Sequence, residues 1–151
     1  MVAYRSPREY AWAAWLDCLS VAYQYEALQA RLSRPLRYQP DFWLPATEAW
    51  LEIKAARPTY GEARVAKQLA EADARPVFVA AGWPYSGEKL EVWKYHRDGS
   101  YLFGLGRDAL RLVACDGAGV TYEAALAAAR EVSVRHQEFC EVWASARKGE
   151  R

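Results

Sequence analysis

The chain has 151 residues, enough for about one domain, and its 20 basic and 19 acidic side chains leave a formal net charge of +1. This balance excludes a strongly basic arm and an acidic disordered tail, although a local basic groove could still bind nucleic acid. No apolar run approaches the roughly 18 residues that a membrane-spanning helix needs. The three cysteines form no C-x-x-C pair. We therefore expect a soluble, cytoplasmic protein without a zinc ribbon or a disulfide framework.

The first expected element is a helix that begins after Ser6. Residues 6–9, Ser-Pro-x-Glu, are typical of a capping box with proline at the first helical position. Apolar residues follow at helical spacing, at Trp12, Trp15, Leu16 and Leu19. Residues 21–26 then predict a short strand, and residues 27–36 a loop or a short helical excursion.

The next segment predicts a β-hairpin followed by a β-α-β unit. Two extended runs, residues 37–45 and 49–55, flank a short turn. Residues 60–72 have a helical pattern, and Lys67 and Gln68 lie on a side of this helix that could face the site. Pro76 opens a further extended run. This order predicts that the strands before and after the helix pair in parallel.

The second half of the chain begins with another hairpin. Asp98-Gly99 separates the extended runs 90–95 and 100–105. One more short strand is expected over residues 109–114, and a single long helix from Thr121 to about Ser145. We expect one α/β domain over 1–151 with the order α-β-β-β-α-β. Its core spans about residues 4–82, and a hairpin with a C-terminal helical extension spans about 88–146.

Alternation along the first hairpin places three charged side chains on one face. If the apolar sets of the two strands share the core, Asp41, Glu52 and Lys54 share the opposite face. Two adjacent carboxylates repel each other unless a cation such as Mg²⁺ neutralises them. Such an ion polarises a phosphate and lowers the pKa of an attacking water, which a lysine can orient. The set predicts metal-assisted phosphodiester hydrolysis, and the alternative is a solvated strand face.

Pro40-Asp41 followed by Glu52-Ile53-Lys54 resembles the motif of the PD-(D/E)XK nuclease superfamily, which has the restriction-endonuclease-like fold. The opening residues YRSPREYAWAAWLD also resemble the first helix of small bacterial and phage members. The resemblance covers about residues 4–82. It implies a mixed β-sheet flanked by helices, with Asp41 and Glu52 as ligands of Mg²⁺, for which Mn²⁺ substitutes, and Lys54 as the catalytic lysine.

The same resemblance implies two additional contributors to the site. The Ile53 carbonyl is a further candidate metal ligand, and Glu9 would complete the site through the metal or a water. Glu9 has an equally supported structural role, because a capping-box glutamate belongs three residues after Ser6. Glu26 is the runner-up as third carboxylate.

Four arginines near the first hairpin are candidate contacts to DNA phosphates. The alternative for them is an ordinary solvated surface. They are Arg31, Arg34, Arg37 and Arg57.

The expected function is that of a Mg²⁺-dependent deoxyribonuclease acting in bacterial or phage DNA processing. A structure-selective junction resolvase is an alternative within this class, and it would be a homodimer because symmetric cuts need two sites. The C-terminal helix offers either a dimer surface or a lid on the sheet. A different class is a catalytically inactive nuclease-fold protein that binds nucleic acid or a protein partner.

Overall fold

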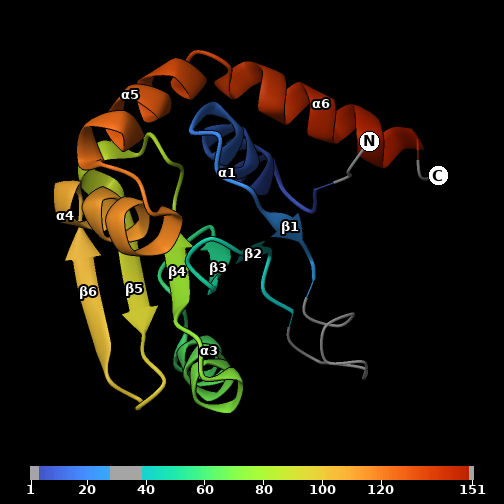
Figure 1. The fold of residues 1–151 in the computed structure, drawn as a ribbon. Helices are drawn as coiled ribbons and strands as arrows, with labels where there is room; N and C mark the ends of the chain where they lie inside the picture. The colour runs from blue at the N-terminus through green and yellow to red at the C-terminus, as the bar shows by residue number, and fades with distance from the viewer. Residues whose placement is uncertain (1–3, 28–38, 150–151) are drawn as a thin grey trace.

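The computed structural model of the chain describes residues 4–27 and 39–149. The protein has an α/β fold built on an open, mixed, six-stranded sheet in which the strand order follows the chain order (Figure 1). All neighbouring strands are antiparallel except β3 and β4, which are parallel. The strands are β1 Gln24–Tyr25, β2 Phe42–Leu44, β3 Ala49–Lys54, β4 Val77–Ala81, β5 Glu91–Tyr95 and β6 Tyr101–Leu105. The predicted α/β class is confirmed at this level.

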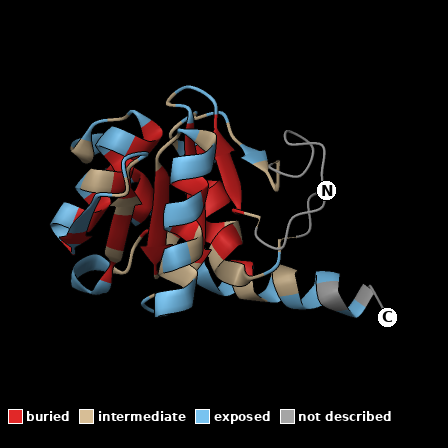
Figure 2. Cartoon of the chain, turned by 90° about the horizontal axis from the view of Figure 1, so that it is seen from below, coloured by how far each residue is buried: buried red, intermediate tan, exposed pale blue. Residues whose placement is uncertain are grey.

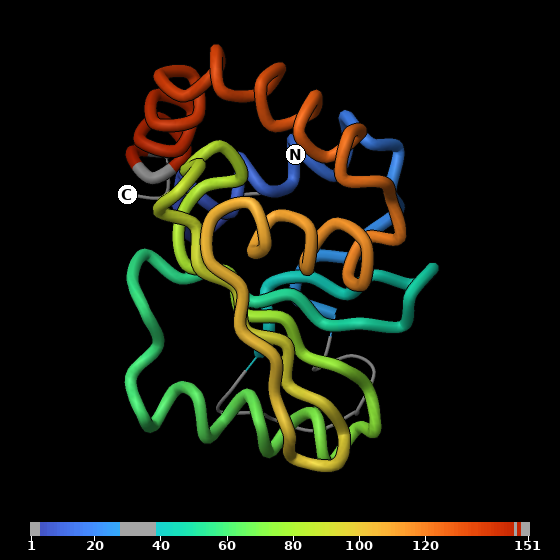
Figure 3. Tube along the Cα trace, turned by 90° about the vertical axis from the view of Figure 1, so that its left-hand side faces the viewer, coloured from blue at the N-terminus to red at the C-terminus, as the bar shows by residue number. Residues whose placement is uncertain are grey.

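Helices cover both faces of the sheet (Figure 3). One face packs against α1 (Pro7–Cys18), α4 (Arg107–Arg111) and the π-helical segment η2 (Leu112–Ala118), and α5 (Tyr122–Ser133) packs on these helices. The other face packs against α3 (Tyr60–Asp73), while α6 (His136–Gly149) packs on α1. A short 3₁₀ turn, η1 (Gly87–Lys89), precedes β5. Within the described residues, no helix is both long enough and apolar enough to cross a membrane.

The predicted β-hairpin is formed by β2 and β3. Phe42 lies opposite Leu51 and faces α1, whereas Trp43 lies opposite Trp50 and faces α3. The turn between the strands is closed at Glu48, which adopts a positive φ of 51°. Figure 2 shows the central strands buried in red, so both faces of the hairpin carry core side chains.

The predicted β-α-β unit is also present. Thr59 caps α3 through a complete capping box, because its hydroxyl accepts the Glu62 N–H while the Glu62 carboxylate accepts the Thr59 N–H. The helix ends at Ala74, which has a left-handed conformation. The chain then enters β4, in which every residue is buried and which pairs in parallel with β3.

Two predictions for the second half of the chain are wrong. Residues 109–114 form α4 and η2 rather than a strand, because their buried side chains recur at helical spacing, at Ala109, Leu110, Val113 and Ala114. The expected single helix over 121–145 is two helices, α5 and α6. The Ser133 hydroxyl donates to the Arg130 carbonyl, and such a local bond competes with the helical ladder at the break.

One earlier segment also differs from expectation, and another lies mostly outside the described residues. The strand expected over residues 21–26 is present only as the two-residue β1. The loop or helical excursion expected over residues 27–36 lies almost entirely outside the described residues.

Candidate functional site

The pairing of β2 with β3 brings two of the predicted carboxyl groups together. Since Phe42 lies opposite Leu51, Asp41 lies opposite Glu52, and both side chains are buried. A hydrogen bond joins the two carboxyl groups. Asp41 Oδ2 also accepts the Ile53 backbone N–H at 2.7 Å, which fixes the orientation of the aspartate.

Glu9 enters the same cluster from the first turn of α1. Its buried carboxyl group accepts the Tyr25 hydroxyl at 2.6 Å and the Ser6 hydroxyl at 3.0 Å, and it is hydrogen-bonded to Asp41. The Glu9 backbone N–H donates to Ser6 Oγ at 3.1 Å and caps the helix. The N-cap bond is thus made by the Glu9 amide, while the carboxyl group, for which the sequence left a cap role and a site role open, bonds to the Ser6 hydroxyl and to the cluster.

Crowding of these acids changes their titration. Burial, followed by the charge of Asp41, raises the pKa of Glu9 to about 7. Burial, followed by the hydrogen bond and the charge of Glu52, raises the pKa of Asp41 to about 8. The cluster therefore retains protons near neutral pH. A divalent cation stabilises the charged carboxylates and would displace these protons.

Lys54 extends from the end of β3 on the same face as Glu52. Its ammonium group lies 2.8 Å from Glu62 Oε2. Burial opposes the charged form of Lys54, but the Glu62 hydrogen bond and the charges of Glu52 and Glu62 outweigh it and raise the pKa of Lys54. Lys54 therefore remains an ammonium ion, paired with Glu62 on α3.

A groove of about 600 Å³ separates β3 from the N-terminal half of α3. Glu52 and Lys54 line it from the sheet, and Thr59, Glu62 and Gln68 line it from the segment that begins and forms the helix. The groove gives a ligand a route from the surface to the Glu52 side of the carboxyl cluster.

The donor atoms of the cluster fit a hard divalent cation in chemical type. Carboxylate oxygens of Asp41, Glu52 and Glu9 are ligands that Mg²⁺ and Mn²⁺ favour. The Ile53 carbonyl faces the Asp41 side, because the N–H and C=O of one strand residue point to the same neighbour. Over residues 4–27 and 39–149, no three or more His, Cys, Asp or Glu side chains are arranged to hold a metal ion.

The predicted phosphate contacts divide into two groups. Arg57 Nε donates to Glu91 Oε2 at 3.2 Å. Glu91 lies at the same end of the sheet as Lys54, since Ala81 pairs with both residues. The remaining three arginines, Arg31, Arg34 and Arg37, lie outside the described residues. The runner-up carboxylate Glu26 forms an ion pair with Arg5 Nε at 2.7 Å.

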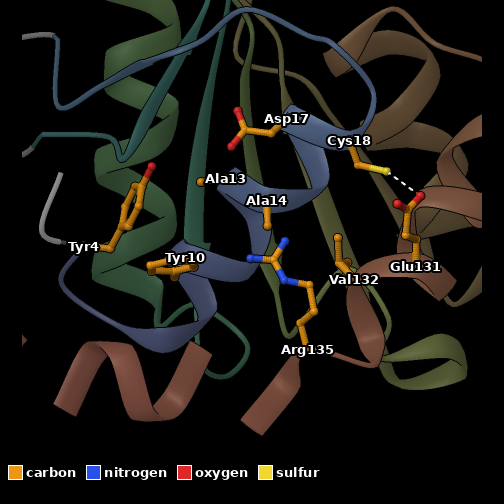
Figure 4. Close-up of a pocket in the computed structure, with 9 residues that line it drawn as sticks. All are labelled: Tyr4, Tyr10, Ala13, Ala14, Asp17, Cys18, Glu131, Val132 and Arg135. Atoms are coloured by element: carbon orange, nitrogen blue, oxygen red, sulfur yellow. Dashed lines mark hydrogen bonds between the residues drawn. The ribbon is translucent and has the colours of Figure 1, made fainter. Parts of the chain in front are cut away.

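A second hollow lies between α1 and α5, on the other side of α1 from the sheet (Figure 4). The Cys18 thiol donates to Glu131 Oε2 at 3.0 Å, as the dashed line in Figure 4 shows. This hydrogen bond, followed by burial, raises the pKa of Cys18. Cys18 therefore carries less thiolate at neutral pH than an ordinary cysteine.

Sequence reasoning missed two residues that bond directly to the predicted site. Tyr25 bonds to Glu9 from β1, and Glu62 pairs with Lys54. The Thr59-x-x-Glu62 capping-box pattern was a usable signal for Glu62, whereas Tyr25 meets Glu9 only through tertiary packing. The chain matches no family model, no curated protein and no solved structure. The carboxyl cluster and its groove are thus the observations from which a function is inferred.

Proposed function

We propose that the protein is a divalent-metal-dependent nuclease that hydrolyses DNA phosphodiester bonds. The observation that carries this proposal is the buried, cross-strand contact of Asp41 and Glu52, with Glu9 bonded to Asp41. Lys54 adds a cation on the same face of β3. The element order α1-β1-β2-β3-α3-β4 supports a restriction-endonuclease-like core, in which this arrangement is expected.

Each residue has a defined role in the proposed reaction. Asp41, Glu52 and the Ile53 carbonyl would hold Mg²⁺ or Mn²⁺, and the ion would polarise the phosphate and acidify a bound water. Lys54 would orient the attacking water and offset the negative charge that develops on the phosphate. Glu9, fixed by Tyr25 and Ser6, would position Asp41.

The direct test is a cleavage assay on plasmid, linear duplex, single-stranded DNA and a four-way junction, with Mg²⁺, Mn²⁺ or EDTA. Glu52→Gln should abolish metal-dependent cleavage, and Lys54→Ala should slow it by about 10²–10³-fold. Lys67→Ala is the matched control, because Lys67 is an exposed lysine on α3 that does not line the groove. Failure of the parent protein to cut any of these forms with either metal would contradict the proposal.

A second candidate is a catalytically inactive protein of the same fold that binds nucleic acid. The observation that favours it is closure of the site, because Lys54 bonds to Glu62 and the carboxyl groups bond to one another. Calorimetry separates the two candidates. A nuclease site should bind Mn²⁺, and Asp41→Ala should remove that binding. The inactive protein should bind DNA equally with and without EDTA, and Asp41→Ala should leave this affinity unchanged.

A further inference from the structure

The outer edge of β6 is apolar and open. β6 is the last strand of the sheet, and none of the described residues forms a strand beyond it (Figure 1). Its sequence contains no charged residue and no proline, the features by which natural edge strands avoid pairing. Four of its five side chains are large, apolar and exposed, namely Tyr101 (61%), Leu102 (50%), Phe103 (45%) and Leu105 (55%).

The hydrogen-bond pattern shows which backbone groups face outward. The His96 N–H donates to the Ser100 carbonyl at 2.8 Å, and the Gly106 N–H donates to the Leu90 carbonyl at 2.7 Å. Bonded and non-bonded pairs alternate along an antiparallel ladder, so the even-numbered residues of this segment bond to β5. The N–H and C=O groups of Tyr101, Phe103 and Leu105 therefore point away from the sheet.

We propose that a second copy of this chain binds at this edge, with the two β6 strands antiparallel about a two-fold axis at Phe103. This register places Phe103 opposite Phe103 of the second copy, and Tyr101 opposite Leu105 of the second copy. All three outward residues of each strand are then paired, which gives about six hydrogen bonds. A shift of two residues in either direction leaves one outward residue of each strand unpaired.

The chemistry of the edge favours a second copy as the occupant. Residues 101–105 carry no charge and expose apolar side chains, so a second β6 offers a strand of matching length whose apolar side chains lie against them. The Phe103 ring packs on Trp93 with 4.9 Å between centroids, and the Tyr101 ring packs on Tyr95 with 5.8 Å. Pairing across the axis would continue this aromatic layer from one sheet into the next.

The edge is separate from the candidate active site. β4 and β5 lie between β6 and the β2–β3 hairpin that carries Asp41 and Glu52. The dimer would therefore carry two sites that both remain open, and the inference does not depend on the proposed function.

The first test is the oligomeric state of the full chain, measured by analytical ultracentrifugation over a wide concentration range. The parent should sediment as a species of twice 17.1 kDa. Phe103→Lys and Leu105→Lys should each raise the dimer dissociation constant at least about tenfold, because they place charge in an apolar strand pair. Leu105→Lys separates loss of the dimer from misfolding, because Leu105 makes no aromatic ring contact, whereas Phe103→Lys removes the Phe103–Trp93 contact. Val134→Lys, at an 84% exposed apolar position, should leave the dimer intact.

The second test is the register. Cysteines are introduced by Phe103→Cys or Tyr101→Cys in a chain whose native Cys18, Cys115 and Cys140 are replaced by serine. The two Phe103 Cα atoms should lie about 5.5 Å apart, within disulfide range. The two Tyr101 positions are offset by four residues, about 13 Å. Oxidation should therefore cross-link Phe103→Cys and leave Tyr101→Cys uncross-linked.

Three results would overturn the proposal. The first is a parent chain that stays monomeric at every concentration, whether or not it binds an added extended peptide. The second is a dimer that both lysine variants leave unchanged. The third is cross-linking that is stronger through Tyr101→Cys than through Phe103→Cys.

Discussion

Glu9 and Asp41 are buried carboxyl groups that are hydrogen-bonded to each other, and their titration links the site to the stability of the fold. Their pKa values are raised to about 7 and about 8, from ordinary values of 4.5 and 3.8. Between about pH 4 and pH 8 the folded chain therefore binds more protons than the unfolded chain. The contribution of these groups to stability is complete below their ordinary pKa values and is lost as the pH rises through the raised ones.

The first prediction concerns this loss. In EDTA, the free energy of unfolding of the parent protein should fall between pH 5 and pH 8.5. Asp41→Asn should flatten the fall, because the amide cannot lose a proton. Urea unfolding at several pH values measures both. Asp108→Asn is the control, since Asp108 is exposed on α4 and should leave the parent profile unchanged. A parent stability that rises over this range would contradict the assignment.

The second prediction concerns Lys54. Glu62→Gln removes the charge beside the ammonium group but keeps a side chain that can complete the capping box of α3. The pKa of Lys54 should fall, because the carboxylate that raises it is gone. An NMR titration of the lysine side chains measures the change. Glu71→Gln, at an exposed position on the same helix that does not line the groove, should have no effect on the Lys54 titration.

At the scale of elements, short-range sequence patterns were sufficient to predict the helices and hairpins whose interacting residues are close in the chain. The β2–β3 hairpin, the capped α3 and the β5–β6 hairpin follow from alternation, capping and turn residues. The segment 109–114 was mispredicted because a short apolar run fits a strand or a buried helix equally well. The choice is made by tertiary packing of α4 against Gly104 of β6.

The third prediction tests that packing. A Cβ atom at Gly104 would lie 2.8 Å from the Ala109 backbone nitrogen, so Gly104→Ala forces strand and helix apart. We expect a loss of about 1–3 kcal/mol in the free energy of unfolding, measured with urea. Gly61→Ala is the control within α3, where the nearest atom to the new methyl group is 4.0 Å away. It should be neutral or stabilising by up to ~1 kcal/mol.

At the scale of the whole molecule, the two ends of the chain complete one core. α1 lies against α5 and α6, and Trp15 Nε1 donates to the Ala125 carbonyl at 3.1 Å. The Tyr10 and Phe139 rings meet with 5.3 Å between centroids. No local pattern encodes contacts between residues so far apart in the chain. The sequence therefore predicted the apolar stripe of α1 but not the helices that cover it.

The fourth prediction concerns how much the packing of α6 on α1 stabilises the fold. Phe139 is fully buried, and Phe139→Ala should cost about 3–5 kcal/mol and lower the Tm. Val134→Ala, at the exposed break between α5 and α6, should change stability by no more than about 0.5 kcal/mol. Thermal unfolding of the two variants at equal protein concentration gives the comparison. Equal losses in both would contradict the packing described.

The strand order has a consequence for synthesis on the ribosome. Every strand pairs with the strand before it in the chain, so the sheet can be assembled in the order in which it is translated. α1 is made first, yet α5 and α6, which pack on it, are made last. A nascent chain that ends before α5 leaves the apolar side of α1 exposed and is a target for chaperones. An arrest-peptide experiment should accordingly record its final pulling force only when α6 has left the exit tunnel.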